Sequence, residues 1–256
     1  MTVLGTGTSF GIPQIGCKCK TCLSDDPRDR RTRVAAVFED DSGQHRVVVD
    51  TPPELRLQLV ANEVESVEAV LYTHDHADHV HGIDDLRAIS ARCGRLPLYG
   101  PREVLERITA RFTYIFDDGV IPPAGTSKPQ LSTVPLEVGE PISVAGMTVV
   151  PLECGHGDMR VFGYRIGDFG YLTDVKTVPD ETRALLAGVE ILVLNALFDQ
   201  PHPTHLSIPE AIDVARSIGA RRTLLTHLTH RYRHAELDAR LPDGVAPAYD
   251  GLAITL

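Results

Sequence analysis

The sequence has no excess of positive charge and no long apolar segment. Its 25 lysines and arginines are outnumbered by 35 aspartates and glutamates, so the formal net charge is −10. This balance argues against a nucleic-acid partner, which would need a basic surface. No apolar run reaches the roughly 18 residues of a membrane span, so we expect no membrane partner. The segment Met1–Gly5 also lacks the basic and then apolar pattern of a signal peptide, and we therefore expect a cytoplasmic protein.

Cysteine is scarce as well, with five residues in the chain. Without an export signal, clustered cysteines bind metal more often than they form disulfides. The 256 residues are 43% apolar, which is enough to bury a sizeable core. We expect one domain that covers residues 1–256.

Short β-like runs alternate with fewer helical segments along the chain. Strands are predicted at Val34–Glu39, Arg46–Asp50, Val67–Thr73, Ile142–Val144, Met147–Leu152, Phe162–Ile166, Gly170–Thr173, Ile191–Leu194, Thr223–Thr226 and Ala253–Leu256. Helices are predicted at Pro53–Ala61, Val80–Ala91, Arg102–Arg111, Pro179–Ala187, Ile208–Ser217 and His234–Arg240. The segment Asp117–Pro129 is rich in glycine and proline and is expected to be a loop.

Three of the apolar runs end in a threonine that precedes a possible metal ligand. These ligands are His74, Asp174 and His227. Buried strands that deliver polar residues at their carboxyl ends are a common way for α/β proteins to build a site.

The strongest single signal is the sequence HDHADH at residues 74–79. His74 and His76 are two residues apart, so on an extended segment they face the same way and can share one metal ion. Asp78 and His79 follow where a helical pattern begins, so they can point to a second ion. Imidazole and carboxylate together suit Zn²⁺, Mn²⁺ or Fe²⁺. The alternative is a polar loop that caps the next helix, with its histidines in water.

This segment matches the H-x-H-x-D-H motif of the metallo-β-lactamase superfamily, and the chain resembles that family from residue 1 to about residue 230. The resemblance implies an αββα sandwich, in which two mixed β-sheets are flanked by helices. It also implies two divalent ions, zinc or manganese, in the active site. The implied ligands are His74, His76 and His156 for the first ion, Asp78, His79 and His227 for the second, and Asp174 for both.

A second possible metal cluster lies near the amino terminus. Cys17, Cys19 and Cys22 offer three thiolates within six residues, and His230 is the candidate for a fourth ligand. This pattern resembles the structural zinc site of the phosphoribosyl 1,2-cyclic phosphate phosphodiesterases, a subgroup from the carbon–phosphorus lyase pathway. A closed Cys₃His site would tether the amino-terminal loop to the strand before His227. The alternative is three free surface cysteines.

The resemblance implies hydrolysis of a small phosphate diester, such as a cyclic phosphate of ribose or a nucleotide, by a hydroxide that bridges two metal ions. The predicted catalytic residues are Asp78 and His205, with His205 as general acid. His202 is the alternative for that role. Asp75 is expected to orient a ligand histidine.

Two other activities share parts of this pattern. One is a thiolester hydrolase of the same superfamily. The other is an iron-dependent oxygenase that resembles the pyrroloquinoline quinone biosynthesis protein, which also carries a C-x-C-x-x-C loop. We expect a small phosphate ester as the partner and, by analogy alone, a homodimer.

Overall fold

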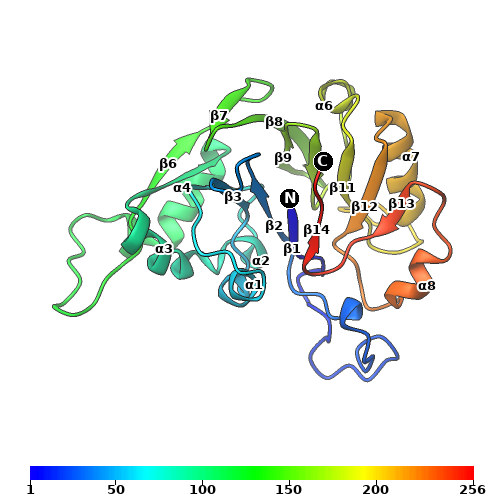
Figure 1. The fold of residues 1–256 in the computed structure, drawn as a ribbon, viewed down its shortest axis with the longest axis horizontal. Coiled ribbons are helices and arrows are strands. Elements are labelled where there is room, and N and C mark those ends of the chain that lie inside the picture. The colour runs from blue at the N-terminus through cyan, green and yellow to red at the C-terminus, as the bar shows by residue number, and fades with distance from the viewer.

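The computed structural model describes residues 1–256 and contains two seven-stranded β-sheets (Figure 1). The first sheet has the strand order β14 (Leu252–Ala253), β1 (Thr2–Gly5), β2 (Ala35–Glu39), β3 (Arg46–Val49), β4 (Ala69–Leu71), β5 (Leu96–Gly100) and β6 (Leu131–Pro135). The second has the order β13 (Val245–Pro247), β12 (Arg222–Thr226), β11 (Ile191–Asn195), β10 (Phe169–Leu172), β9 (Met159–Ile166), β8 (Met147–His156) and β7 (Ile142–Val144). Both sheets are mixed, because β3 to β6 and β10 to β13 pair in parallel and the remaining neighbours pair antiparallel.

Helices cover the outer face of each sheet, which gives four layers (Figure 1). The first sheet carries α1 (Leu55–Ala61), α2 (Ala77–Val80), α3 (Leu86–Cys93), α4 (Arg102–Arg111) and α5 (Thr113–Phe116). The second carries α6 (Asp180–Leu186), α7 (Ile208–Ile218) and α8 (His234–Asp238). Two short 3₁₀ turns lie at Pro27–Asp29 and Ile83–Asp85. The predicted αββα sandwich is confirmed.

Three buried clusters hold these layers together. One lies between the sheets, where Phe38 meets Phe169 and Tyr171 with edge-to-face rings 5.8 and 6.2 Å apart. The other two lie between each sheet and its own helices. Strand β11 is buried along its whole length, as expected for a parallel strand with both faces covered.

Several element boundaries differ from the sequence prediction for physical reasons. Helix α4 matches its predicted bounds, but the helix predicted at Val80–Ala91 is broken into α2, a 3₁₀ turn and α3. The break occurs because the N–H of Gly82 donates to Thr51 O at 2.8 Å instead of to the preceding helical turn. Strands β1, β5, β6 and β13 were not predicted, and β5, β6 and β13 contain proline, which argues against strands in sequence patterns.

No helix in the structure combines the length and apolar character that crossing a membrane requires.

Candidate metal centre

The seven residues predicted as active-site ligands come together at one edge of the sandwich. Their donor atoms form overlapping groups, and within each group every donor atom lies within 4.8 Å of the others. The groups that hold the seven are His74, His76 and His156; His74, His79 and Asp174; and Asp78, His79 and His227. His74 belongs to two of these groups and is fully buried, so it lies near the centre of the cluster.

The chain leaves its strands in a left-handed conformation at two of the predicted ligands and at one further residue beside them. Asp50, Asp174 and His227 have φ values of 64°, 56° and 54°. Each of them lies just past the end of a buried strand of one sheet or the other. Positive φ is uncommon outside glycine and collects at functional sites, where the surrounding structure offsets its cost.

Hydrogen bonds to Nδ1 orient three of the histidines. His79 Nδ1 lies 2.7 Å from Asp50 Oδ2, and His156 Nδ1 lies 2.8 Å from Thr204 O. His74 Nδ1 lies 2.9 Å from Thr73 Oγ1. Such partners fix the orientation of the imidazole ring, so that its Nε2 atom is free to bind a metal ion.

Asp50 is a site residue that the sequence reasoning missed. It is fully buried and also accepts hydrogen bonds from the N–H and hydroxyl of Thr73 at 2.9 and 2.8 Å. Its position directly after an apolar strand, as for His74 and His227, is the signal that could have found it.

The role expected for Asp75 is wrong. Its carboxylate binds Arg107 Nη1 at 3.2 Å and Arg111 Nη2 at 3.0 Å, both from α4, and no histidine. Arg111 also donates to the Asp75 carbonyl at 2.5 Å. Because Asp75 stands between His74 and His76, these bonds hold the ligand loop against α4.

The cluster fits a metal site by its unpaired donors. The Nε2 atoms of His79 and His227 are buried and have no hydrogen-bond partner. They lie 3.5 and 3.2 Å from the two carboxylate oxygens of Asp174. A buried polar atom without a partner is costly, and a shared cation would satisfy both nitrogens.

The electrostatics of the cluster also suit a cation. Burial lowers the pKa of His74 well below its ordinary value and lowers that of His227 to about 4. Burial alone would raise the pKa of Asp174, but His227 and His79 beside it hold that pKa well below the usual range. Burial likewise disfavours the charged form of His79, yet Asp174 and Asp50 raise its pKa well above the ordinary value. At neutral pH the cluster therefore presents the Asp174 carboxylate and neutral imidazoles at His74 and His227, which are the forms that bind metal, while His79 would release its proton when a cation binds.

The two candidate general acids lie at different depths. His205 Nε2 is 3.1 Å from Asp174 Oδ2, and its ring stacks on His227 with centroids 4.7 Å apart. The ring of His202 lies behind it, 5.3 Å from His205, and burial lowers its pKa. Only His205 of this pair touches the ligand cluster.

The cysteine cluster assembles with the histidine predicted for it. Cys17, Cys19 and Cys22 place their Sγ atoms 3.3, 3.7 and 3.6 Å from His230 Nδ1. A tetrahedral zinc ion with ordinary bond lengths would separate sulfur and nitrogen ligands by about 3.6 Å. Within the trio, a hydrogen bond from the Cys22 N–H helps to lower the pKa of Cys19 to about 7.

A buried arginine ties this cluster to the rest of the chain. Arg31 is fully buried and donates to the carbonyls of Thr229 and Tyr232 at 2.5 and 3.1 Å. These two residues flank His230 on its loop. Arg31 therefore holds the loop that follows β12 on both sides of His230, and this loop begins at His227.

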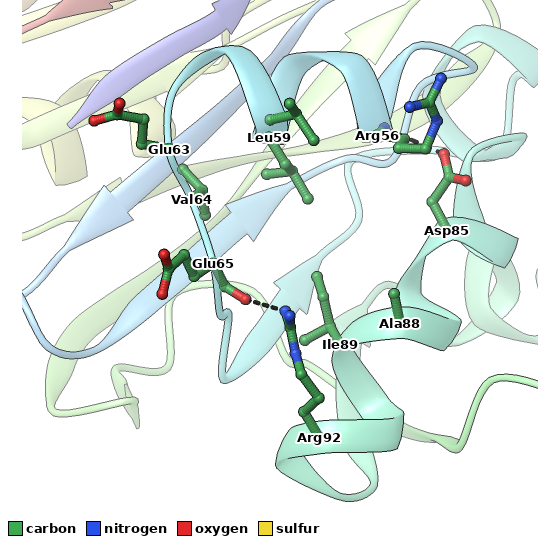
Figure 2. Close-up of a pocket in the computed structure, with 10 residues that line it drawn as sticks. Arg56, Leu59, Glu63, Val64, Glu65, Asp85, Ala88, Ile89 and Arg92 are labelled. Atoms are coloured by element: carbon green, nitrogen blue, oxygen red, sulfur yellow. Dashed lines mark hydrogen bonds between the residues drawn. The ribbon is translucent and has the colours of Figure 1, made fainter.

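A separate cavity of about 730 Å³ lies between α1 and α3 (Figure 2). Leu59, Val64 and Ile89 line it, and Arg92 donates to the carbonyl of Glu65 at its edge. None of the predicted ligands lines this cavity. The chemistry-bearing residues are gathered at the sandwich edge instead.

The sandwich and its histidine–aspartate cluster define the class of protein, the metallo-β-lactamase-like fold. The family described as "Beta-lactamase superfamily domain" matches residues 45–228, which is more than half of the chain. The chain belongs to this superfamily. The resemblance predicted from the H-x-H-x-D-H motif is confirmed.

Among the similar proteins, a relative and a solved structure each match almost the whole chain at more than 35% identity. An octanoyltransferase from Porphyromonas gingivalis is 38% identical over 98% of the chain, but the chain spans only half of that protein's length. The crystal structure of a diphosphatase from the PhnP family is 36% identical with a TM-score of 0.90, and the match covers 100% of this chain and 96% of that one.

Two more distant relatives carry other names. The coenzyme PQQ synthesis protein B of Methylorubrum populi is 25% identical over 76% of the chain and 72% of its own length. The ribonuclease Z of Pyrobaculum neutrophilum is 26% identical over 83% of the chain and 88% of its own length.

Proposed function

We propose that the chain is a metal-dependent phosphodiesterase that hydrolyses a small phosphate diester. The observation that carries the proposal is the convergence of five histidines and two aspartates, with two buried Nε2 atoms that no protein group satisfies. The names of two relatives support the phosphate chemistry, since one is a diphosphatase and the other a ribonuclease.

The donor atoms suit two divalent ions, zinc or manganese. His74, His76 and His156 would hold the first, Asp78, His79 and His227 the second, and Asp174 both. Bound there, the ions would lower the pKa of a water molecule and offset negative charge on the phosphoryl oxygens. A structural zinc ion would occupy Cys17, Cys19, Cys22 and His230.

The side chains around the ions would position the reaction and move its protons. Asp50 and Thr204 hold His79 and His156 in place through Nδ1, so the cluster is ordered before substrate arrives. His205 Nε2 lies 3.1 Å from Asp174 Oδ2 and would carry its proton there, beside the ions that would bind the phosphoryl group. It would give that proton to the departing alkoxide as general acid.

The substrate is a small ester and not a polynucleotide. The net charge of −10 argues against an extended basic surface of the kind that tracks a phosphate backbone. A compact diester would place its charge at the cluster alone.

The test is hydrolysis of bis(p-nitrophenyl) phosphate by the purified protein with added Mn²⁺ or Zn²⁺. We expect metal-dependent turnover that is lost in His76→Ala. His205→Ala should lower kcat about 10²- to 10⁴-fold with its metal content unchanged, whereas His202→Ala should have a smaller effect. Absence of turnover with metal loaded would contradict the phosphodiesterase proposal. Metal loss in His205→Ala would contradict the general-acid role.

A thiolester hydrolase is the second candidate. The 38% identity to a protein named octanoyltransferase favours it, although that protein is twice as long as the match. Hydrolysis of an octanoyl thiolester, run beside the phosphodiester with the same His76→Ala control, separates the two candidates. Turnover of the thiolester alone would select this one.

A further inference from the structure

A buried asparagine lies on the strand between the two that lead to Asp174 and His227. Asn195 is the last residue of β11, and its side chain is fully buried. Strand β11 pairs in parallel with β10 on one side and with β12 on the other. In this register Asn195 stands opposite Thr226, the residue before His227. Its amide therefore lies at the level where both neighbouring strands release their predicted ligands.

A buried hydrogen bond connects Asn195 to the turn that carries Asp174. The carboxamide oxygen of Asn195 accepts from the backbone N–H of Val175 at 2.7 Å. Val175 directly follows Asp174, whose φ of 56° lies in the left-handed region. A non-glycine residue keeps such a conformation only where surrounding contacts hold it. The bond from Val175 to Asn195 is a contact of this kind, because it fixes the peptide unit between Asp174 and Val175.

The same turn holds the loop of His205. The carbonyl of Val175 accepts a hydrogen bond from the N–H of Leu206 at 3.0 Å. Leu206 directly follows His205, whose Nε2 lies 3.1 Å from Asp174 Oδ2. A shift of the chain at Val175 would therefore move both the carboxylate that is predicted to join two ions and the histidine proposed as general acid.

Packing alone does not account for an asparagine at this position. Its Nδ2 atom is buried and donates to no other group of the chain. A buried donor without a partner is costly, and asparagine is disfavoured inside strands. Leucine has a similar shape and would avoid both costs, so the amide of Asn195 contributes through its acceptor oxygen.

We propose that Asn195 is a positioning residue for the metal centre. Through the N–H of Val175 it holds the Asp174 carboxylate where both ions can share it, and it keeps His205 against that carboxylate. Asn195 itself belongs to none of the ligand groups. The catalytic part of this inference rests on the proposed phosphodiesterase function, whereas the geometry of the metal centre can be tested without turnover.

The test uses Asn195→Leu, which keeps the size of the side chain and removes the acceptor. Two Mn²⁺ ions that share a carboxylate are magnetically coupled, so electron paramagnetic resonance reports whether Asp174 joins them. We expect a coupled spectrum for the manganese-loaded wild-type protein. In the variant, the second ion should bind about 10- to 100-fold more weakly, and the uncoupled signal should grow.

Two further measurements follow the hydrogen bond and the reaction. In the zinc-loaded protein, the Val175 amide should exchange its hydrogen about 2- to 12-fold faster in Asn195→Leu than in the wild type, the effect of losing one hydrogen bond. With bis(p-nitrophenyl) phosphate, kcat should fall about 10- to 100-fold while KM changes less than about threefold, because the reacting groups remain but are misplaced.

Thr226→Val and Val193→Ala are the matched controls. Thr226 is buried opposite Asn195, and its hydroxyl also lacks a partner, so the first variant removes a polar group without removing a bond. Val193 is buried two residues earlier in β11, so the second variant destabilises the same strand and leaves the bond to Val175 in place. Both controls should retain the coupled spectrum and the kcat of the wild type.

Asn195→Ala removes the same acceptor with a smaller side chain and should reproduce every effect, which keeps the test decisive if leucine prevents folding. A coupled spectrum and a wild-type kcat in both Asn195 variants would overturn the proposal, as would absence of coupling in the wild type. The same loss of coupling in Val193→Ala would also overturn it, because Asn195 would then act only through stability. If the wild type shows the coupled spectrum but hydrolyses no diester, the phosphodiesterase proposal fails, and the spectra of the variants still decide the role of Asn195.

Discussion

The hydrogen bond between Asp50 and His79 offers the sharpest test of how the metal centre is built. Asp50→Asn keeps a residue that tolerates the positive φ of 64° and can still accept a bond from Thr73. It removes the carboxylate that lies 2.7 Å from His79 Nδ1. His79 then loses its tether and part of its basicity while its own side chain remains.

The magnitude follows from the role of such orienting partners. Loss of a group that fixes a ligand histidine weakens metal binding about 10- to 100-fold, or about 1.4 to 2.7 kcal/mol. We expect this loss for Mn²⁺, measured by electron paramagnetic resonance titration of the metal-free protein. Manganese is the suitable probe because the three thiolates of the cysteine cluster select zinc instead.

Asp75→Asn is the matched control. Asp75 lies in the ligand loop itself, but its carboxylate contacts Arg107 and Arg111. The carbonyl of Asp75 would still accept from Arg111 in the variant, so we expect less than a threefold change in Mn²⁺ affinity, about 0.6 kcal/mol. If Asp75→Asn weakened Mn²⁺ binding as much as Asp50→Asn, or if Asp50→Asn had no effect, the assignment of Asp50 as the tether would be wrong.

Three further outcomes follow from the structure. In chelator-treated protein, iodoacetamide should modify Cys19 before Cys22, because the pKa of Cys19 is about 7 whereas burial raises that of Cys22 to about 11. The Cys19 thiolate forms as the pH rises through about 7, so modification should increase over that range. Zinc should protect both cysteines, and peptide mass spectrometry would show each result. Phe38 is 2% exposed in the core between the sheets, so Phe38→Ala would leave a cavity there. Urea unfolding should show that the free energy of unfolding falls by about 3–5 kcal/mol, and a fall below about 1 kcal/mol would contradict the packing described. Gly82→Ala would bring a Cβ to 2.0 Å from the carbonyl oxygen of Pro52, so it should destabilise the protein by about 1–3 kcal/mol in the same assay, and wild-type stability would refute this close approach.

The sequence was sufficient to predict which residues cluster at the candidate metal centre, because they follow strongly patterned strands. His74 and His227 each come after an apolar run whose burial was evident from composition alone, and HDHADH places four donors in six residues. The structure brings them within one cluster, as the family motif implied. The cysteine trio and His230 also meet, although 208 residues separate Cys22 from His230.

The groups that orient the ligands could not be found by the same reasoning. The partner of His156 is a backbone carbonyl, that of Thr204, and every residue type provides one. Asp75 looked like an orienting residue from its place in the motif, but α4 carries two arginines that capture it. Sequence spacing identifies which atoms can bind a metal, whereas tertiary packing decides which neighbours hold those atoms.

The same distinction explains why several short strands were missed, whereas the residues of the histidine–aspartate cluster were identified. Strands such as β5 and β6 depend on pairing with their neighbours, and their proline residues obscure the local pattern. The strands that precede His74 and His227, β4 and β12, each have a neighbour on both sides and are almost fully buried, so their composition alone shows them. Because burial from both sides is also what fixes the strand end in space, the elements that are easiest to predict are those that can hold a metal centre in place. Residues that directly follow a buried strand can therefore be predicted as well as the strand itself. Asp50, directly after β3, is such a residue, and its counterpart can be looked for in any chain of this fold.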